Sequence, residues 1–401
     1  MAIDNKDKKV LKSSIEREQN ELACSAEREK IKGSKNLNVP HLRFPEFTKE
    51  WEMASLQDIA AVNPKSNPLQ NSFVYIDLEA VEKGELRKIQ EVMREEAPSR
   101  AQRVIYKNDI LFQCVRPYQK NNYIHKIQSK SNQQWVASTG YAQIRTTEIP
   151  NYIYHLLNTD GFNRKVMVRC TGSSYPAINS EDLATIRFYL TTDTKEQLKI
   201  SRLLDLLDER IATQNKIIEK LQSLIKGLAA QLTQSGTPNI CLCDCLECHS
   251  STLQENCVSA TGSYPVYGAT GLIGYTNNYA YNGESILIVK DGSGVGSLSY
   301  VNDHFSVIGT LNYLTAKEKH SMLYLYYALM AFNFTPYITG MAIPHIYFKD
   351  YGKAKLFYPS TEKRIRIASL LHNIEQKLVV EQKLVISLST QKSYLLRMLF
   401  I

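Results

Sequence analysis

Two long segments of the chain carry apolar residues at alternating steps of four and three, which is the period of a heptad helix. They lie near residues 194–232 and 361–400, and the second repeats the first at an offset of 167 residues. Even a polar interruption recurs, at Gln214 and at Glu381. The apolar positions are Ile200, Leu204, Leu207, Ile211, Ile218, Leu221, Ile225 and Leu228, and then Ile367, Leu371, Ile374, Leu378, Val385, Leu388 and Leu395. The pattern predicts two helices of about 60 Å, each with one apolar stripe to bury.

A second repeated motif precedes each of these helices. Residues 171–189 and 339–358 both begin Thr-Gly and continue through Pro and Asp to Phe-Tyr, starting at an offset of 168 residues. Upstream of both copies, short runs alternate in the manner of β-strands and are followed by one helical stretch. The sequence therefore predicts an α+β module that is written twice, with a long helix after each copy.

Pairing the two long helices antiparallel would bury both stripes and leave the modules at opposite ends, related by a pseudo-two-fold axis. The alternative is that each helix packs separately on its own module. The predicted organisation is a charged N-terminal helical extension (1–39), a first module (40–190), a helical spacer (191–235), a second module (236–358) and a second helical spacer (359–401).

Charge permits a nucleic-acid partner without requiring one, because 48 basic and 40 acidic residues give a net charge of +8 over 401 residues. The second module is acidic: residues 240–350 hold four lysines and eight acidic residues. A grip on DNA that is purely electrostatic is therefore implausible for that module. The apolar runs are too short to span a membrane and the N-terminus has no apolar signal core, so we expect a cytoplasmic protein without membrane contact.

Four of the eight cysteines crowd into Cys241, Cys243, Cys245 and Cys248, and metal binding must be considered. The one-residue spacing would place the first three on one face of a strand, unlike the usual paired zinc knuckles. Aligning residues 55–62 with 241–248 puts Cys245 and Cys248 at the positions of two apolar residues of the first module. Because cysteine buries as a small hydrophobe, we predict core packing and no metal site.

Several motifs, in order, resemble the specificity subunits of type I restriction-modification enzymes. They are the segment from Asn38 to Phe47 with Trp51, the two Thr-Gly…Pro motifs, and the openings Lys195-Glu-Gln-Leu-Lys-Ile and Glu362-Lys-Arg-Ile-Arg-Ile. The resemblance implies two target-recognition domains, held apart by an antiparallel coiled coil, each of which reads one half of a split, asymmetric sequence in double-stranded DNA. One departure is that the second spacer opens with Glu362-Lys363 instead of Glu-Gln.

The resemblance also implies that catalysis belongs to partner subunits. Two modification subunits would use S-adenosylmethionine, and restriction subunits would use ATP and Mg²⁺, whereas this chain would hold no cofactor. The sequence agrees in lacking a phosphate-binding Gly-x-x-x-x-Gly-Lys-Ser/Thr loop and the Asn-Pro-Pro or Asp-Pro-Pro signature of amino-methyltransferases. Two rival functions remain: a coiled-coil scaffold that does not touch DNA, and a self-contained enzyme with an unrecognised site.

Candidate DNA contacts combine basic, amide, hydroxyl and aromatic side chains near predicted loops. Arg and Lys bridge guanine or phosphate, and Asn and Gln bracket adenine. The alternatives are a solvated turn around residue 118 and a structural turn before Pro176. The candidates are Arg116, Tyr118, Gln119, Lys120, Asn121, Asn122, Ser173 and Ser174 in the first module, and Tyr267, Lys290, Asp291, Ser293 and His345 in the second.

Overall fold

The computed structural model describes residues 38–127, 133–318 and 320–401, so the predicted extension 1–39 lies almost entirely outside the described residues. The chain divides into two compact units. The N-terminal unit combines the described residues up to Ile211 with Leu388–Ile401, and the C-terminal unit is built on Ala212–Ser387. Each long helix contributes residues to both units, and the predicted domain boundaries remain a prediction.

The N-terminal unit contains two four-stranded sheets, ordered β6-β3-β10-β7 and β2-β11-β8-β9. Neighbouring strands are antiparallel except for β3 and β10, which are parallel. The single helical stretch predicted for this module is two helices, because Thr159 caps the second of them by accepting a bond from the Phe162 N–H. The elements are β1 (Glu52–Ser55), α2 (Leu56–Ile59), β2 (Ala60–Val62), β3 (Ser72–Ile76), β4 (Val81–Glu82), β5 (Glu85–Leu86), β6 (Gln90–Met93), β7 (Ala101–Ile105), β8 (Ile110–Gln113), β9 (Tyr123–Ile124), β10 (Gln134–Ser138), β11 (Tyr141–Thr146), α3 (Pro150–Leu157), α4 (Asp160–Arg169), α5 (Ser180–Ala184) and β12 (Arg187–Leu190).

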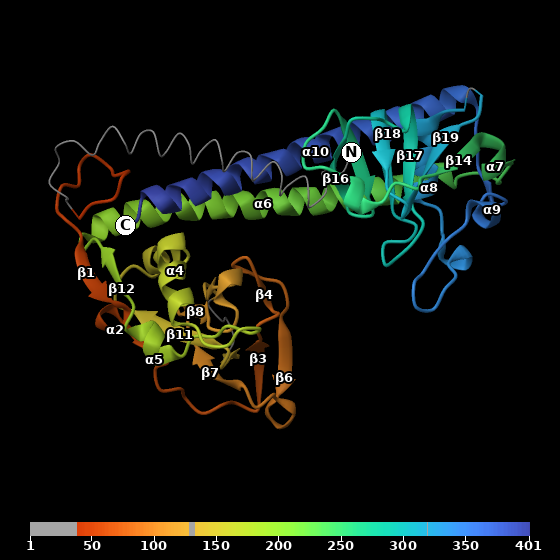
Figure 1. Ribbon diagram of the computed structural model, residues 1–401. Coiled ribbons are helices and arrows are strands. Elements are labelled where there is room, and N and C mark those ends of the chain that lie inside the picture. Colours follow the sequence, from red (N-terminus) through yellow and green to blue (C-terminus); the bar gives the residue numbers. More distant parts are fainter. Residues whose placement is uncertain (1–37, 128–132, 319) are drawn as a thin grey trace, which may run out of the picture. The chain divides into compact units, whose positions relative to one another are not determined.

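The C-terminal unit contains one six-stranded sheet, ordered β14-β19-β17-β18-β15-β16 (Figure 1). The largest core cluster of each unit lies between strands and helices; in this unit Ile286, Ile288 and Leu314 pack with Tyr324 and Leu371. Its elements are β13 (Ile240–Cys241), α7 (Leu242–Cys245), β14 (Leu246–Ser250), β15 (Tyr264–Gly268), β16 (Gly271–Thr276), β17 (Tyr281–Val289), β18 (Leu298–Val307), β19 (Leu311–Ala316), α8 (Met322–Met330), α9 (Phe348–Tyr351) and β20 (Lys355–Leu356).

Matching strand registers show that the two units repeat one fold. Strand β2 pairs with β11 so that Ala60 faces Thr146, and β14 pairs with β19 so that Leu246 faces Ala316. In both units the strand before the first short helix also pairs with the strand that leads into a long helix, as β1 with β12 and β13 with β20. The prediction of a duplicated α+β module is therefore confirmed.

The cysteine cluster does not lie on one strand face, as the spacing suggested, because Cys243 and Cys245 belong to the short helix α7. Cys245 is completely buried in the core of the C-terminal unit, and Cys248 packs against that core. Burial raises the pKa of the Cys248 thiol to about 11, which keeps the thiol protonated at neutral pH. Both cysteines thus replace apolar side chains of the first module.

The long helices α6 (Thr194–Thr233) and α10 (Thr361–Met398) pair antiparallel, and the alternative of separate packing is wrong (Figure 1). In the N-terminal unit Asp208 forms a 2.5 Å ion pair with Lys392, and in the C-terminal unit Gln214 donates a hydrogen bond to Glu381. All the predicted apolar positions of both helices are buried or half-buried.

The bond from Gln214 to Glu381 joins the two polar interruptions of the heptad pattern. In an antiparallel pair of equivalent helices, equivalent positions can face each other at only one place, the centre of the pair. Gln214 and Glu381 are such equivalents, and Gln214 is 1% exposed. A buried polar contact of this kind fixes the register of the two helices, because sliding would leave the buried Gln214 amide without this partner.

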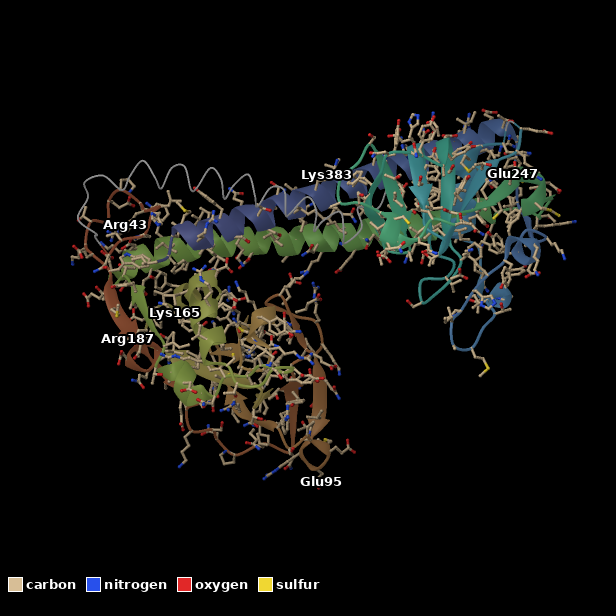
Figure 2. All side chains as sticks on the ribbon, viewed as in Figure 1. Arg43, Glu95, Lys165, Arg187, Glu247 and Lys383 are labelled. Atoms are coloured by element: carbon tan, nitrogen blue, oxygen red, sulfur yellow. The ribbon has the colours of Figure 1, made fainter. Side chains whose placement is uncertain are left out.

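The start of α6 is tied to the N-terminal unit by a buried ion pair. Arg43, which is labelled in Figure 2, donates two hydrogen bonds to Glu196, at 2.7 and 2.9 Å, and the Glu196 side chain is 0% exposed. Gln197 is equally buried and donates to Glu148 and to the Thr191 carbonyl. Where the second spacer departs from this sequence, Arg364 instead stacks on Tyr358 at 4.0 Å.

Buried side chains of α3 in the N-terminal unit and of α8 in the C-terminal unit each bind a carboxylate of a long helix. In the N-terminal unit the His155 ring lies 2.9 Å from Asp205, and in the C-terminal unit Tyr326 and Tyr327 donate to Glu375 at 3.1 and 2.8 Å. Burial lowers the pKa of His155 and raises the pKa of both tyrosines. Both carboxylates are therefore bound by side chains that are uncharged at neutral pH, and Lys126 adds a 3.7 Å ion pair to Asp205.

We expect the N-terminal unit to lose stability as the pH falls from 6.5 towards 4. His125 is 2% exposed, its ring lies 4.9 Å from Trp135, and burial lowers its pKa to about 4. The unfolded chain protonates this histidine near pH 6.5, whereas the folded unit does so only near pH 4. The free energy of unfolding therefore has its full value above pH 6.5 and falls by up to about 3 kcal/mol as the pH drops towards 4. Urea unfolding followed by tryptophan fluorescence would measure it, since Trp51 and Trp135, the two tryptophans of the chain, both belong to this unit.

The matched control is His125→Phe, which keeps an aromatic ring beside Trp135 and cannot titrate. Its unfolding free energy should depend less steeply on pH between 4 and 6.5. Equal slopes for the variant and the unaltered chain would contradict the assignment to His125.

Candidate nucleic-acid interface

Each unit contains a closed loop with the repeated Thr-Gly…Pro motif, between α4 and α5 in the N-terminal unit and between α8 and α9 in the C-terminal unit. In the N-terminal unit Thr171 and Ala177 bond to each other through their backbones at 2.9 Å in both directions, and in the C-terminal unit Thr339 and His345 do so at 2.9 and 2.8 Å. Gly172 and Gly340 hold nearly the same left-handed conformation, with φ of 87° and 88°. We call these segments, residues 171–177 and 339–345, the exit loops.

The strand end beside each exit loop is held by one further backbone bond. The Arg116 N–H donates to the Pro176 carbonyl, and the Gly292 N–H donates to the Pro344 carbonyl, both at 2.8 Å. Arg116 and Gly292 are therefore equivalent positions. Both are left-handed, with φ of 54° and 98°. Such a conformation suits glycine but is uncommon for arginine, and held strain of this kind is typical of functional sites.

The side chain of Arg116 stacks on the exit loop of the N-terminal unit. Its guanidinium carbon lies 4.3 Å from the centre of the Tyr175 ring, and Tyr175 is 63% exposed. Within the described part of the chain no acidic side chain pairs with Arg116. A guanidinium that lies over an aromatic ring can keep its N–H edge available, and this is the edge that binds guanine or phosphate.

The residues predicted around Arg116 have different environments. Tyr118 is 52% exposed, and Ser173 and Ser174 are exposed on the exit loop, so these three accompany Arg116 on the surface. Gln119 is exposed but accepts a hydrogen bond from Gln113 at 3.0 Å.

The other three predicted residues of this segment make internal contacts. Lys120 forms a 2.5 Å ion pair with Asp160, and Asn121 accepts a bond from the Lys83 N–H. Asn122 is 2% exposed and bonds to the Gln113 N–H and to Asn158, which favours a structural role over the predicted DNA contact.

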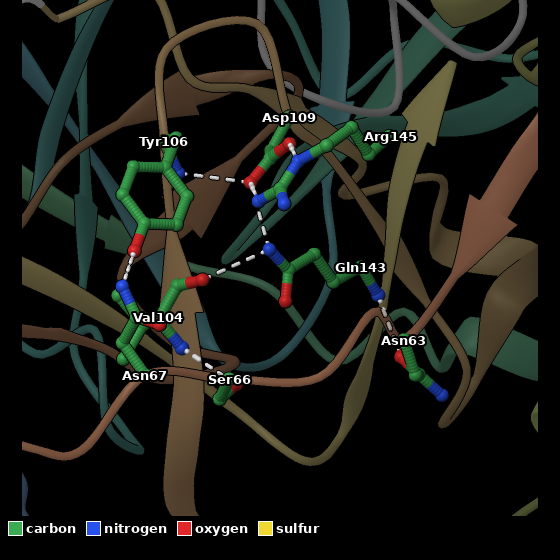
Figure 3. Close-up of polar contacts among 8 residues, drawn as sticks. All are labelled: Asn63, Ser66, Asn67, Val104, Tyr106, Asp109, Gln143 and Arg145. Carbon is green, nitrogen blue, oxygen red and sulfur yellow. Dashed lines mark hydrogen bonds and ion pairs between the residues drawn. The ribbon is translucent and has the colours of Figure 1, made fainter.

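A buried polar network fixes the opposite end of strand β8, which leads to Arg116 (Figure 3). Asp109 is 1% exposed and accepts two bonds from Arg145, at 2.8 and 2.7 Å, and one from Gln143 at 2.7 Å. The bonds to Asp109 raise the pKa of Arg145. Arg145 also lies over the ring of Tyr106 at 4.9 Å. The network anchors β8 and so positions the residues that follow the strand.

The predicted contacts of the C-terminal unit are dispersed. Tyr267 packs against Phe305 next to the core, which favours a structural role, and Ser293 is exposed. Lys290 lies 3.9 Å from its neighbour Asp291, and Asp291 forms a backbone bridge with His345 of the exit loop. Asp291, Ser293 and His345 therefore lie around one exit loop, as Arg116, Ser173 and Ser174 lie around the other.

The sequence analysis missed three exposed side chains of the exit loops. One is Tyr175, whose ring lies under the Arg116 guanidinium. The other two are Met341 and Ile343, which are 105% and 64% exposed and form the tip of the second loop. The signal was available for all three, because they stand inside the repeated motif itself.

Other kinds of site find little support. Over residues 38–127, 133–318 and 320–401 no group of three or more His, Cys, Asp and Glu side chains is arranged to hold a metal ion. The same residues include no helix that combines the length and apolarity needed to cross a membrane.

A duplicated α+β module, exposed loops at equivalent places with different side chains, and a pair of antiparallel helices define a class of protein built as an internal repeat on two long helices. The family model for the type I restriction modification DNA specificity domain matches residues 48–223 and 242–388. The chain belongs to this family.

Related proteins agree with this assignment. The chain is 26% identical over 112 residues to the EcoprrI specificity subunit of Escherichia coli, a match that covers 28% of each chain. It is 30% identical over 138 residues to a putative type I specificity subunit of Mycoplasma pneumoniae, covering 32% of this chain and 43% of that protein. The alignments thus span less than half of these relatives.

Solved structures share the fold at low sequence identity. The S subunit of a type I restriction-modification system from M. genitalium superposes with a TM-score of 0.63 at 16% identity, covering 90% of this chain and 99% of that one. A chain from a study of complex assembly and conformational transition of the type I R-M system superposes with a TM-score of 0.52 at 19% identity, covering 89% and 98%.

Proposed function

We propose that this chain is a DNA sequence-specificity subunit that binds a split, asymmetric sequence in double-stranded DNA, one half-site through each unit. The observation that carries the proposal is the strained, stacked Arg116 beside the exit loop. A fold needs no arginine in a left-handed conformation, whereas a reader of guanine or phosphate gains a guanidinium of fixed orientation. Because the exit loops carry different side chains, the two half-sites should differ.

Partners would supply the chemistry. In this proposal two modification subunits, which use S-adenosylmethionine, and restriction subunits, which use ATP and Mg²⁺, assemble on the chain, and the chain itself is not catalytic. Large apolar side chains on the outer surface of α6 support a protein partner there: Leu198, Leu206 and Leu224 are each about half exposed.

The test is to co-express the chain with its modification subunit in a host without methylation and to map methylated bases by long-read sequencing. We expect one split, asymmetric motif. Replacing residues 236–358 with the second module of another specificity subunit should change one half-site and leave the other intact.

The control is the Arg116→Gly variant, which should lose or relax only the half-site that survives the swap. If a stable complex produces no new methylation, the proposal is wrong and a scaffold that does not bind DNA is favoured. Salt-sensitive binding to duplex DNA distinguishes a DNA-binding subunit from such a scaffold, because binding to DNA releases counterions and its affinity therefore falls as the salt concentration rises.

Lengthening both helices should lengthen the unread spacer between the half-sites. One heptad inserted beside Gln214 and another beside Glu381 keeps the apolar stripes of the two helices facing each other. The insertions lengthen the helix pair by roughly 10 Å, or about three base pairs at 3.4 Å each. The methylation map should then show both half-sites unchanged and a longer spacer. A heptad inserted in α6 alone is the control, since it shifts the apolar stripe of α6 relative to that of α10 and should abolish modification. An unchanged spacer in the double insertion would refute the idea that the helices set the distance.

A further inference from the structure

The two exit loops present opposite chemistry at equivalent positions. Where the N-terminal unit carries Ser173, Ser174 and Tyr175, the C-terminal unit carries Met341, Ala342 and Ile343. The side chains of Met341 and Ile343 are 105% and 64% exposed. In Figure 1 the segment before α9 projects as a loop away from the β-sheet of its unit. Two large apolar side chains at an exposed loop tip contribute nothing to the core and indicate a contact with another molecule.

The backbone of this loop is rigidly closed. Gly340 has a φ of 88°, and a side chain at that position would collide with the Ile343 carbonyl. The His345 ring bonds to the same carbonyl at 3.1 Å, and the backbones of Thr339 and His345 bond to each other. The loop therefore presents its apolar tip in a fixed orientation, which lowers the entropy lost on binding.

Cations are scarce around this tip. Residues 337–348 contain neither lysine nor arginine. Lys349 lies over the Tyr347 ring at 5.1 Å, and Lys290 lies near Asp291. Gly292 occupies the position of Arg116, with open space where a side chain would begin. The guanidinium that can read guanine in the N-terminal unit has no counterpart at this position.

Base edges in the major groove offer one apolar group, the C5 methyl of thymine. We propose that Met341 and Ile343 contact thymine methyl groups in the half-site of the C-terminal unit. This inference rests on the proposed function, since it names the base that one exit loop reads. It also explains how an acidic module with few lysines distinguishes sequences.

The experiment uses the complex of the full chain with its modification subunits and the motif found by the methylation map. Each thymine of the C-terminal half-site is replaced in turn by uracil, which removes only the methyl group. We expect one or two positions at which the affinity falls about three- to fivefold, as for the loss of one buried methyl.

The matched variant is Met341→Ala with Ile343→Ala, whose exposed positions leave the core intact. It should bind the thymine duplex several-fold more weakly and no longer distinguish uracil, while its salt dependence stays unchanged because an apolar contact releases no counterions. Uracil in the N-terminal half-site serves as the control and should affect both proteins equally.

Three results would overturn the inference: a C-terminal half-site without thymine, no uracil-sensitive position in it, or equal sensitivity in the variant. Failure of the proposed function looks different, because the unaltered complex would then bind no duplex with sequence preference.

Discussion

Replacing Arg116 with alanine is expected to cost about 1–3 kcal/mol of discrimination at a single position of the N-terminal half-site. The reason is that the guanidinium stacked on Tyr175 offers two parallel donors, which alanine lacks. The C-terminal half-site should keep its full specificity. Competition binding with duplexes that vary one base pair at a time would measure the effect.

Arg116→Gly separates recognition from folding. Because φ is 54° at this position, glycine should relieve strain and preserve or raise the unfolding free energy. Its binding defect should nevertheless match that of alanine. Arg116→Lys keeps the positive charge but loses the two parallel N–H donors of the guanidinium. Its DNA binding should therefore retain the salt dependence and lose the base preference. Unchanged specificity in the glycine variant would show that Arg116 reads no base.

Removing Arg43 is expected to destabilise the N-terminal unit by about 3–5 kcal/mol, the usual cost of leaving one member of a buried ion pair behind. In Arg43→Ala the Glu196 carboxylate, which is 0% exposed, would lose both of its bonds to the guanidinium. Urea unfolding followed by tryptophan fluorescence measures this unit selectively, because both tryptophans lie in it.

The second variant is Arg43→Ala combined with Glu196→Gln, which removes the orphaned charge. Its unfolding free energy should recover part of the loss. If Arg43→Ala alone costs less than about 1 kcal/mol, the pair behaves as an exposed ion pair and the anchoring role assigned to it is wrong.

The long helices could be predicted because their signal is local and periodic. Fifteen apolar positions at heptad spacing, with Gln214 and Glu381 as matching interruptions, specify both the helices and their partner surface. The first short helix of each module was missed, although Ser55 with Asp58 and Cys241 with Asp244 form the capping arrangement that begins a helix. A four-residue helix has too few positions for a period to be recognised.

The surface around the exit loops was predicted only in part. Arg116, Ser173 and Ser174 share one surface because a backbone bridge joins segments about sixty residues apart, and such a bridge leaves no local pattern. The left-handed conformation of Arg116 could not be predicted from the sequence either, since glycine is the residue that indicates a positive φ. Asn122 resembled its neighbours in composition but is buried, because its amide satisfies the Gln113 N–H.

The meeting of Gln214 with Glu381 bears on how the two halves would behave as separate polypeptides. Two copies of the C-terminal half, paired through α10, would oppose one Glu381 carboxylate to another and repel each other at neutral pH. One copy of each half would restore the amide–carboxylate bond. If the chain is divided between the modules, each N-terminal half should therefore pair with a C-terminal half. The reassembled protein would then still bind the two half-sites in their original order.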